Sequence, residues 1–140
     1  MFNRINRSRT QPLISLAVVL LALSSAAARG GEANLWSGTW AAEGTLFSIA
    51  IEVRENMLHV EEVESLGFQW SASPGRVNGD TANFQVSYAG ATASVQARII
   101  ESGLARVTAS DCVPEFIVVC VLIRNQFAMF YRTSAASASR

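Results

Sequence analysis

The sequence predicts an all-β fold, a single antiparallel up-and-down barrel of about eight strands, with a two-sheet β-sandwich as the alternative. Apolar and polar side chains alternate over residues 81–109, as in strands that turn one face to a core. Turn residues recur about every eleven to thirteen positions, and no window after residue 28 has helical periodicity. A chain of strands without helices must close a barrel or stack two sheets to protect its edges.

The first 28 residues have the pattern of a secretory signal peptide. Arg4, Arg7 and Arg9 precede an apolar run over residues 13–23, and small residues follow up to Ala28. The apolar run is too short to span a bilayer comfortably as a helix. We therefore expect cleavage near Ala28 and a secreted or periplasmic protein with no membrane attachment after signal removal. The alternative is an uncleaved N-terminal anchor.

The remaining chain has the size of one domain. We divide it into a flexible N-terminal segment (29–35), a β-barrel domain (36–132) and a disordered tail (133–140) rich in serine and alanine. Without the three arginines of the signal peptide, eight arginines stand against eleven acidic residues. A mildly acidic domain without a basic stripe argues against nucleic acid and anionic membrane surfaces as partners.

The strands can be placed in order from the alternation and the turn residues. Breaks at Ala89-Gly90 and Ser102-Gly103 are too short for a crossover helix, so the strands that they join are antiparallel. A loss of phase at residues 61–64 predicts a β-bulge, and Ser73-Pro74-Gly75 predicts a bulged bend. The predicted strands cover residues 36–40, 47–54, 57–66, 68–72, 84–88, 93–99, 105–109, 115–124 and 126–132.

Cys112 and Cys120 flank Pro114 and could face each other across a hairpin whose turn lies near residues 113–116. In an exported protein such a pair can form a lasting disulfide, which is our expectation. The alternative is a pair of buried thiols that act as small hydrophobic residues.

Gly38-Thr39-Trp40, at the start of a meander of about eight antiparallel strands in an exported chain, resembles the Gly-x-Trp signature of the calycin-type barrels, the lipocalins and avidins. In lipocalins the tryptophan closes one end of the barrel and is covered by an arginine from the end of the last strand. The resemblance implies this pairing for Trp40 and Arg132, with Arg124 as a second candidate. The chain departs from the family in having no Thr-Asp-Tyr motif, no expected helix after the barrel strands and fewer residues than a typical lipocalin.

Six aromatic residues occupy positions that alternation directs into the barrel. If the interior is roomy, they line a pocket for a small apolar ligand, with the Tyr88 hydroxyl and the indole nitrogens as orienting groups. Otherwise they fill a small barrel, since eight strands leave room for side chains or at most one small ligand. The candidate ligand-binding residues are Trp40, Phe47, Phe68, Trp70, Phe84 and Tyr88, and the small inward residues opposite them are Ala72, Ala93, Ala97, Ala105 and Ala109.

Both faces of the expected strand over residues 116–123 are apolar. A strand of this kind is normally covered on both sides. We expect Ile117, Val119, Val121 and Ile123 to form an outward apolar patch for a protein partner, most simply a second copy of the chain. The alternative is that this strand is covered, either between two sheets or by the residues before Trp36.

No group of residues specifies a reaction. His59 is the only histidine, the only aspartates are Asp80 and Asp111, and no Gly-x-Ser-x-Gly motif occurs. We therefore expect a non-catalytic protein without a metal or another cofactor. His59 and Glu61 share one face of their strand and could offer two metal ligands, but a solvated acidic strand is the simpler interpretation.

Two functional classes follow from the sequence. The first is an exported binding module that holds a small apolar ligand inside the barrel. The second is a protein-interaction or inhibitor module with a packed interior, which uses the apolar strand over residues 117–123 or an acidic patch over residues 61–64.

Overall fold

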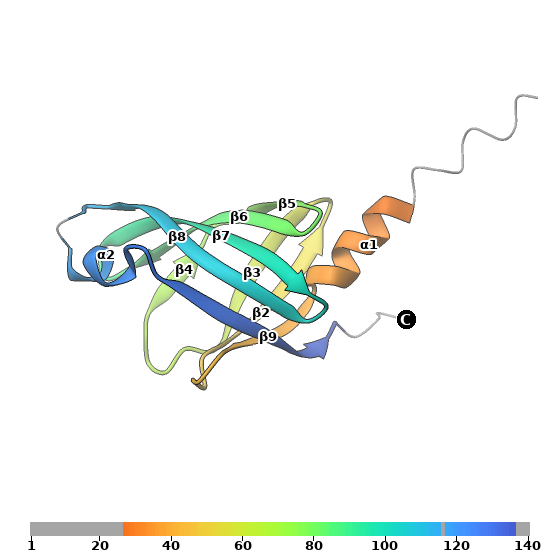
Figure 1. Cartoon of the computed structure of the whole chain (residues 1–140), viewed down its shortest axis with the longest axis horizontal. Coiled ribbons are helices and arrows are strands. Elements are labelled where there is room, and N and C mark those ends of the chain that lie inside the picture. Colours follow the sequence, from red (N-terminus) through yellow and green to blue (C-terminus); the bar gives the residue numbers. More distant parts are fainter. Residues whose placement is uncertain (1–26, 116, 137–140) are drawn as a thin grey trace, which may run out of the picture.

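The computed structural model describes residues 27–115 and 117–136, which form a closed eight-stranded antiparallel barrel with two short helices (Figure 1). The strands are numbered β1 to β9 although the barrel has eight strand positions. β4 and β5 together occupy one of these positions, and both pair with β6. The elements are α1 (Ala27–Trp36), β1 (Gly38–Ala42), β2 (Ser48–Arg54), β3 (Met57–Glu64), β4 (Trp70–Ala72), β5 (Gly75–Asn78), β6 (Thr81–Tyr88), β7 (Ala91–Glu101), β8 (Leu104–Val113), α2 (Val118–Ile123) and β9 (Phe127–Ala135).

The strands follow the predicted up-and-down order. Each position of the barrel pairs with the next one along the chain, and β1 pairs with β9 to close the ring. The predicted barrel is therefore confirmed, and the β-sandwich alternative is wrong. The predicted bulge is present, since Ile49 pairs with Glu62 and Ser48 with Glu64, which leaves Val63 as the extra residue of β3. The predicted bend at Ser73-Pro74 separates β4 from β5.

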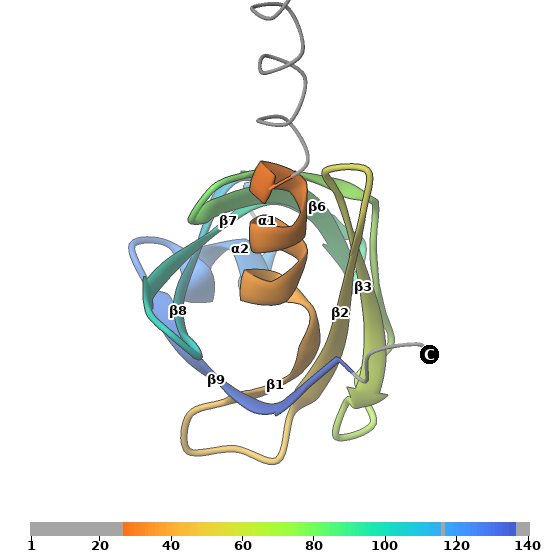
Figure 2. The ribbon, with the colours of Figure 1, turned by 90° about the vertical axis from the view of Figure 1, so that its right-hand side faces the viewer.

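The two helices lie at opposite ends of the barrel (Figure 1). At one end, which we call the closed end, α1 leads into β1 and lies across the opening of the ring of strands (Figure 2). The turns β2–β3, β5–β6 and β7–β8 are also at this end. At the other end, which we call the mouth, lie α2 and the connections β1–β2, β3–β4 and β6–β7.

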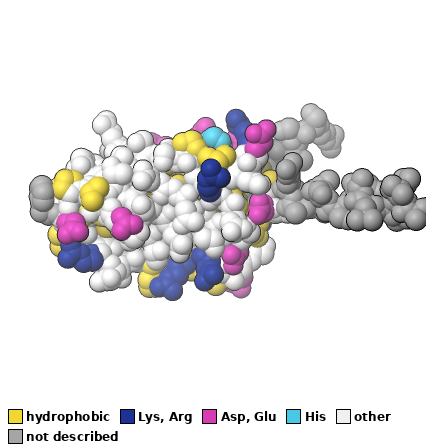
Figure 3. Space-filling view, turned by 90° about the horizontal axis from the view of Figure 1, so that it is seen from above, with side chains coloured by type: hydrophobic (Ala, Val, Ile, Leu, Met, Phe, Trp, Pro, Cys, Tyr) yellow, Lys and Arg dark blue, Asp and Glu magenta, His cyan; other side chains and the backbone are white. Residues whose placement is uncertain are grey.

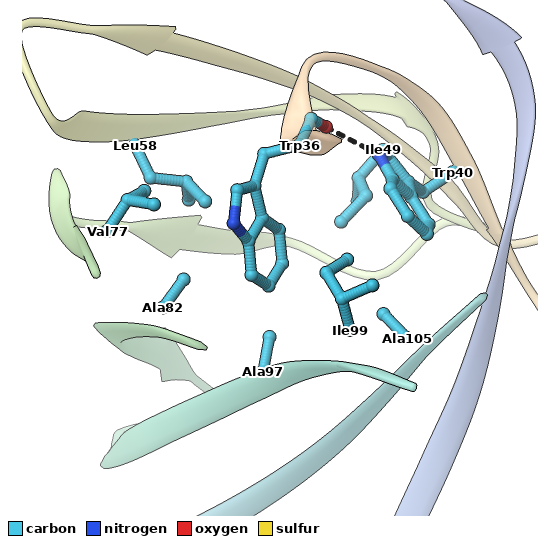
Figure 4. Close-up of a cluster of buried hydrophobic side chains, with 9 residues drawn as sticks. All are labelled: Trp36, Trp40, Ile49, Leu58, Val77, Ala82, Ala97, Ile99 and Ala105. Carbon is cyan, nitrogen blue, oxygen red and sulfur yellow. Dashed lines mark hydrogen bonds between the residues drawn. The ribbon is translucent and has the colours of Figure 1, made fainter. Parts of the chain in front are cut away.

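A tight apolar core occupies the closed end (Figure 4). Trp36, Trp40 and Leu58 are its largest fully buried side chains. Small residues make room for the two indoles, as close packing of unequal side chains requires. The buried members of this core are Trp36, Trp40, Ile49, Leu58, Val77, Ala82, Ala97, Ile99 and Ala105.

The predicted strand over residues 115–124 is wrong, because residues 118–123 form α2. β9 pairs with β8 only over residues 104–108, and the last residues of β8, up to Val113, pair with β7 alone. The chain instead makes one turn of helix, in which the Cys120 and Val121 N–H groups donate to the Ile117 carbonyl oxygen. These local bonds satisfy backbone groups that would otherwise need a partner in a sheet.

The ends of the chain also differ from the expected segments. Residues 29–35, expected as a flexible segment, lie in α1, and Trp36 ends that helix instead of opening β1. β9 continues to Ala135, beyond the start of the expected disordered tail. Residues 1–26, which make up most of the predicted signal peptide, and residues 137–140 lie outside the described residues.

Candidate functional site

The closed end of the barrel is held by hydrogen bonds between α1 and the strands. The Trp36 indole Nε1 donates to the Gly79 carbonyl oxygen at 2.9 Å, and the Gly79 N–H donates to Glu32 Oε1 at 2.7 Å. The Trp40 Nε1 donates to the Trp36 carbonyl oxygen at 2.8 Å (Figure 4). Both buried indoles therefore have partners, and α1 is fixed as a plug at this end.

Arg132 covers Trp40 at the end of β9, as the resemblance to lipocalins implied. Its guanidinium carbon lies 5.8 Å from the centroid of the Trp40 ring, within the range of a cation–π contact. Its Nη1 also donates to the Leu35 carbonyl oxygen at 3.3 Å, which ties β9 to α1. Arg124, the second candidate, directly follows α2 at the mouth.

The glycine of Gly38-Thr39-Trp40 is required by the backbone. Gly38 has φ of +139°, a region that other residues rarely adopt. A Cβ atom at this position would lie 2.2 Å from the Ser134 carbonyl oxygen of β9. Glycine at this position thus allows β1 and β9 to approach closely where the barrel closes.

The half of the barrel toward the mouth is hollow. A cavity of about 570 Å³ lies inside the ring of strands, within the size range of sites for small molecules. Phe68 and Leu122 line it although their exposed fractions are 50% and 69%, so the cavity opens to solvent at the mouth. Its lining is Trp36, Trp40, Phe47, Ile49, Ile51, Leu58, Val60, Phe68, Trp70, Phe84, Val86, Tyr88, Ala91, Ala93, Val95, Ala97, Ala105, Val107, Ala109, Cys112, Val119, Leu122, Ile123 and Phe130.

All six predicted ligand-binding residues line this cavity: Trp40, Phe47, Phe68, Trp70, Phe84 and Tyr88. Their rings contact one another at its wall, with centroids 5.7 Å apart for Phe47 and Trp70 and for Phe68 and Tyr88. Phe68 differs from its prediction in lying in the β3–β4 connection, just before β4. Side chains fill the barrel at the closed end only.

The lining contributes few polar groups. None of its described residues carries a charge, and Cys112 is held in a disulfide. The Trp70 Nε1 is buried and is the only buried side-chain nitrogen or oxygen in the described residues that lacks a hydrogen-bond partner. Tyr88 faces Trp70 directly across the β4–β6 ladder. Trp70 and Tyr88, the two lining residues whose polar atoms have no hydrogen-bond partner in the described residues, therefore lie side by side in the barrel wall.

Residues of α2 complete the mouth, although the sequence did not predict them as part of the site. Val119, Leu122 and Ile123 line the cavity. Their helical placement gave no signal in the sequence, because a helix of six residues is too short to show a period of 3.6.

The predicted outward patch of Ile117, Val119, Val121 and Ile123 is wrong, because it assumed a strand. In the helix, Val119 and Ile123 line the cavity, and only Val121 of the four is exposed. The apolar side chains that α2 exposes are Val118, Val121 and Leu122, which lie three and four residues apart on one helical face.

The expected disulfide is present. Cys112 at the end of β8 is bonded to Cys120 of α2, with Cα atoms 5.4 Å apart. It therefore joins a strand to a helix, whereas the sequence predicted a bond across a hairpin. Because Cys120 is buried and Cys112 lines the cavity, the bond fixes α2 beside the mouth.

The acidic strand lies on the outer wall. No three His, Cys, Asp or Glu side chains gather as a metal site within the described ranges. His59 pairs in register with Glu52, whose pKa is lowered mainly by its hydrogen bond from Arg54. Glu61, Glu62 and Glu64 are exposed. Figure 3 shows charged side chains scattered over an outer surface of mostly neutral groups.

Comparison with known proteins found no matching family model, no matching curated protein and no matching solved structure. Neither helix in the described part of the chain is long and apolar enough to cross a membrane.

Proposed function

We propose that this protein is a non-catalytic binding module that holds a small apolar molecule inside the barrel. The observation that carries the proposal is the cavity of about 570 Å³, which is open at the mouth and lined by apolar side chains. Burying apolar ligand surface against such a lining is favourable by about 25 cal/mol per Å². A core under selection for stability alone would fill this space, because voids cost packing energy.

Within this proposal, the chain is a calycin-like barrel. Two features support this assignment beyond the strand order. Gly38 permits the close approach of β1 and β9, and Arg132 covers Trp40 at the closed end. These features hold one end of the barrel shut, so a ligand enters and leaves by the mouth.

We further propose that the protein acts outside the cytoplasm, in the periplasm or the extracellular medium. The signal-peptide pattern of residues 1–28 and the Cys112–Cys120 disulfide support this location. N-terminal sequencing of the exported protein tests it. A mature chain that begins near residue 29 is expected, whereas full-length protein retained inside the cell would contradict export.

Ligand binding can be tested with the uncharged fluorophore N-phenyl-1-naphthylamine. We expect its emission to rise on binding to the wild-type barrel with one saturable site. Ala109→Trp places an indole in the cavity and should abolish the rise, because Ala109 lines the hollow half. The control is Gln85→Trp, which adds the same ring at an exposed position on β6.

The two variants separate binding in the cavity from binding elsewhere. A wild-type protein that gives no rise, or an equal rise in Ala109→Trp and Gln85→Trp, would contradict the proposal. Thermal unfolding of both variants shows whether each one retains the fold.

A further inference from the structure

The uncharged lining of the cavity restricts the kind of ligand that it can enclose. The described lining residues include no Lys, Arg, His, Asp or Glu. A charged ligand group inside the cavity would lose its hydration without gaining an ion pair, which is strongly unfavourable. The part of the ligand that the barrel encloses should therefore be uncharged.

The hydrogen-bonding groups of the cavity restrict it further. The indoles of Trp36 and Trp40 already donate to carbonyl oxygens, so they are not available to a ligand. Two lining residues have polar atoms without such a partner: the Trp70 Nε1 is unsatisfied, and Tyr88 makes no side-chain hydrogen bond to any described residue. The Trp70 Nε1 is buried, and a buried polar group without a partner costs about 1–3 kcal/mol, which a ligand atom could recover.

The strand register brings these two residues together. Trp70 of β4 and Tyr88 of β6 are directly opposite in an antiparallel pair, so their side chains project from the same face. Each ring is supported by a second aromatic ring, Phe47 beside Trp70 and Phe68 beside Tyr88. The pair lies where the strands approach the mouth, and Trp70 also packs against the buried core.

We infer that the cavity binds an uncharged molecule with an apolar body and a hydroxyl, carbonyl or ether oxygen that is held at the Trp70–Tyr88 pair. This inference rests on the proposed function and names the chemical class of its ligand. The Trp70 indole supplies a donor, and the Tyr88 hydroxyl supplies a donor and an acceptor. An alcohol or a ketone fits both groups, whereas a carboxylate brings a charge that the lining does not balance.

The inference is tested by displacement of N-phenyl-1-naphthylamine with four probes: 1-nonanol, 2-nonanone, nonanoate and n-butylbenzene. At pH 8, nonanoate is fully ionised, and we expect it to bind at least about fivefold more weakly than 1-nonanol. Trp70→Phe and Tyr88→Phe should each weaken binding of 1-nonanol and 2-nonanone about threefold to tenfold, the usual value of one hydrogen bond. Neither variant should weaken the binding of n-butylbenzene to the same extent, because this probe has no hydrogen-bonding group.

Phe84→Leu is the matched control, since Phe84 lines the cavity without a polar atom. Loss of its apolar area should weaken all four probes alike. If Trp70→Phe does not fold, Tyr88→Phe tests the same pair alone, because it removes only a hydroxyl oxygen.

Two outcomes overturn the inference while the proposed function survives. One is that nonanoate binds as tightly as 1-nonanol, and the other is that Trp70→Phe and Tyr88→Phe leave the ratio of 1-nonanol to n-butylbenzene affinity unchanged. If no probe and no fluorophore binds to the wild type, the proposed function fails together with the inference.

Discussion

The closed end and the mouth of this barrel are built from the same strands, yet one end is packed and the other is hollow. At the closed end, the small residues Ala82 and Ala97 lie beneath the Trp36 indole (Figure 4). At the mouth, Ala93 and Ala109 are equally small, but no comparable side chain fills the space in front of them. The strands supply a similar interior at both ends.

The difference arises from the helices. α1 inserts Trp36 into the barrel and is fixed there by hydrogen bonds to Gly79. α2 is fixed by a disulfide beside the opening, and its side chains Val119 and Ile123 line the cavity without occupying it. Whether the interior of an eight-stranded barrel is filled or hollow therefore depends on the side chains that its terminal and connecting helices place inside it.

The largest expected effect comes from replacing the tryptophan that fills the closed end. Trp36→Ala should lower the free energy of unfolding by about 4 kcal/mol, because it leaves a large void and unpairs the Gly79 carbonyl oxygen. Trp70→Ala, at the hollow half, should cost about half as much, because its ring is only half-buried. Urea denaturation measures both values. Equal losses would contradict the division into a packed and a hollow half.

The disulfide at the mouth should have the next largest effect. It closes a loop with a sequence separation of 8, so the Cys112→Ala/Cys120→Ala variant should lose about 2–3 kcal/mol by loop-closure entropy. Hydrogen exchange should rise in α2 and the end of β8 and should stay unchanged in α1. Faster exchange at Trp36 and Trp40 would show that the two ends are not independent.

The strands could be predicted from sequence because their signals are local. Alternation and turn residues define each strand, and the bulge at Val63 follows from a loss of phase within β3. Four of the six aromatic residues of the cavity wall lie in strands and follow the inward alternation, whereas Phe47 and Phe68 lie just before β2 and β4.

The helices could not be predicted because their stability is not local. α1 has two glycines at positions 30 and 31 and is held by bonds to the β5–β6 turn. α2 consists largely of β-branched residues, which favour strands, and the disulfide from Cys120 holds it against the end of β8. Whether the barrel is filled or hollow could not be predicted either. A balance of large and small inward residues suits both arrangements.

Larger side chains should change the stability of the protein in opposite directions in the packed half and in the hollow half. Ala82→Leu, at a position with no exposed area, should destabilise the protein by about 1–3 kcal/mol through overpacking. Ala109→Leu extends into the cavity and should be neutral or stabilise the protein by up to about 1 kcal/mol, because the added methylenes gain apolar contact. Thermal unfolding checks the sign. Destabilisation by both variants would indicate that the hollow half has no room for a side chain.

The smallest expected effect is electrostatic and concerns the outer wall, where neither packing nor the cavity contributes. The Tyr131 hydroxyl donates to Glu43 Oε1 at 3.3 Å, and the nearby carboxylate charge raises the pKa of Tyr131 above its ordinary value of 10.0. Because a negative neighbour disfavours the phenolate, Glu43→Gln should lower this pKa toward 10.0. Absorbance titration in a Tyr88→Phe background follows Tyr131 alone, since the chain has two tyrosines. A pKa that does not fall in Glu43→Gln would show that the two side chains do not interact in solution.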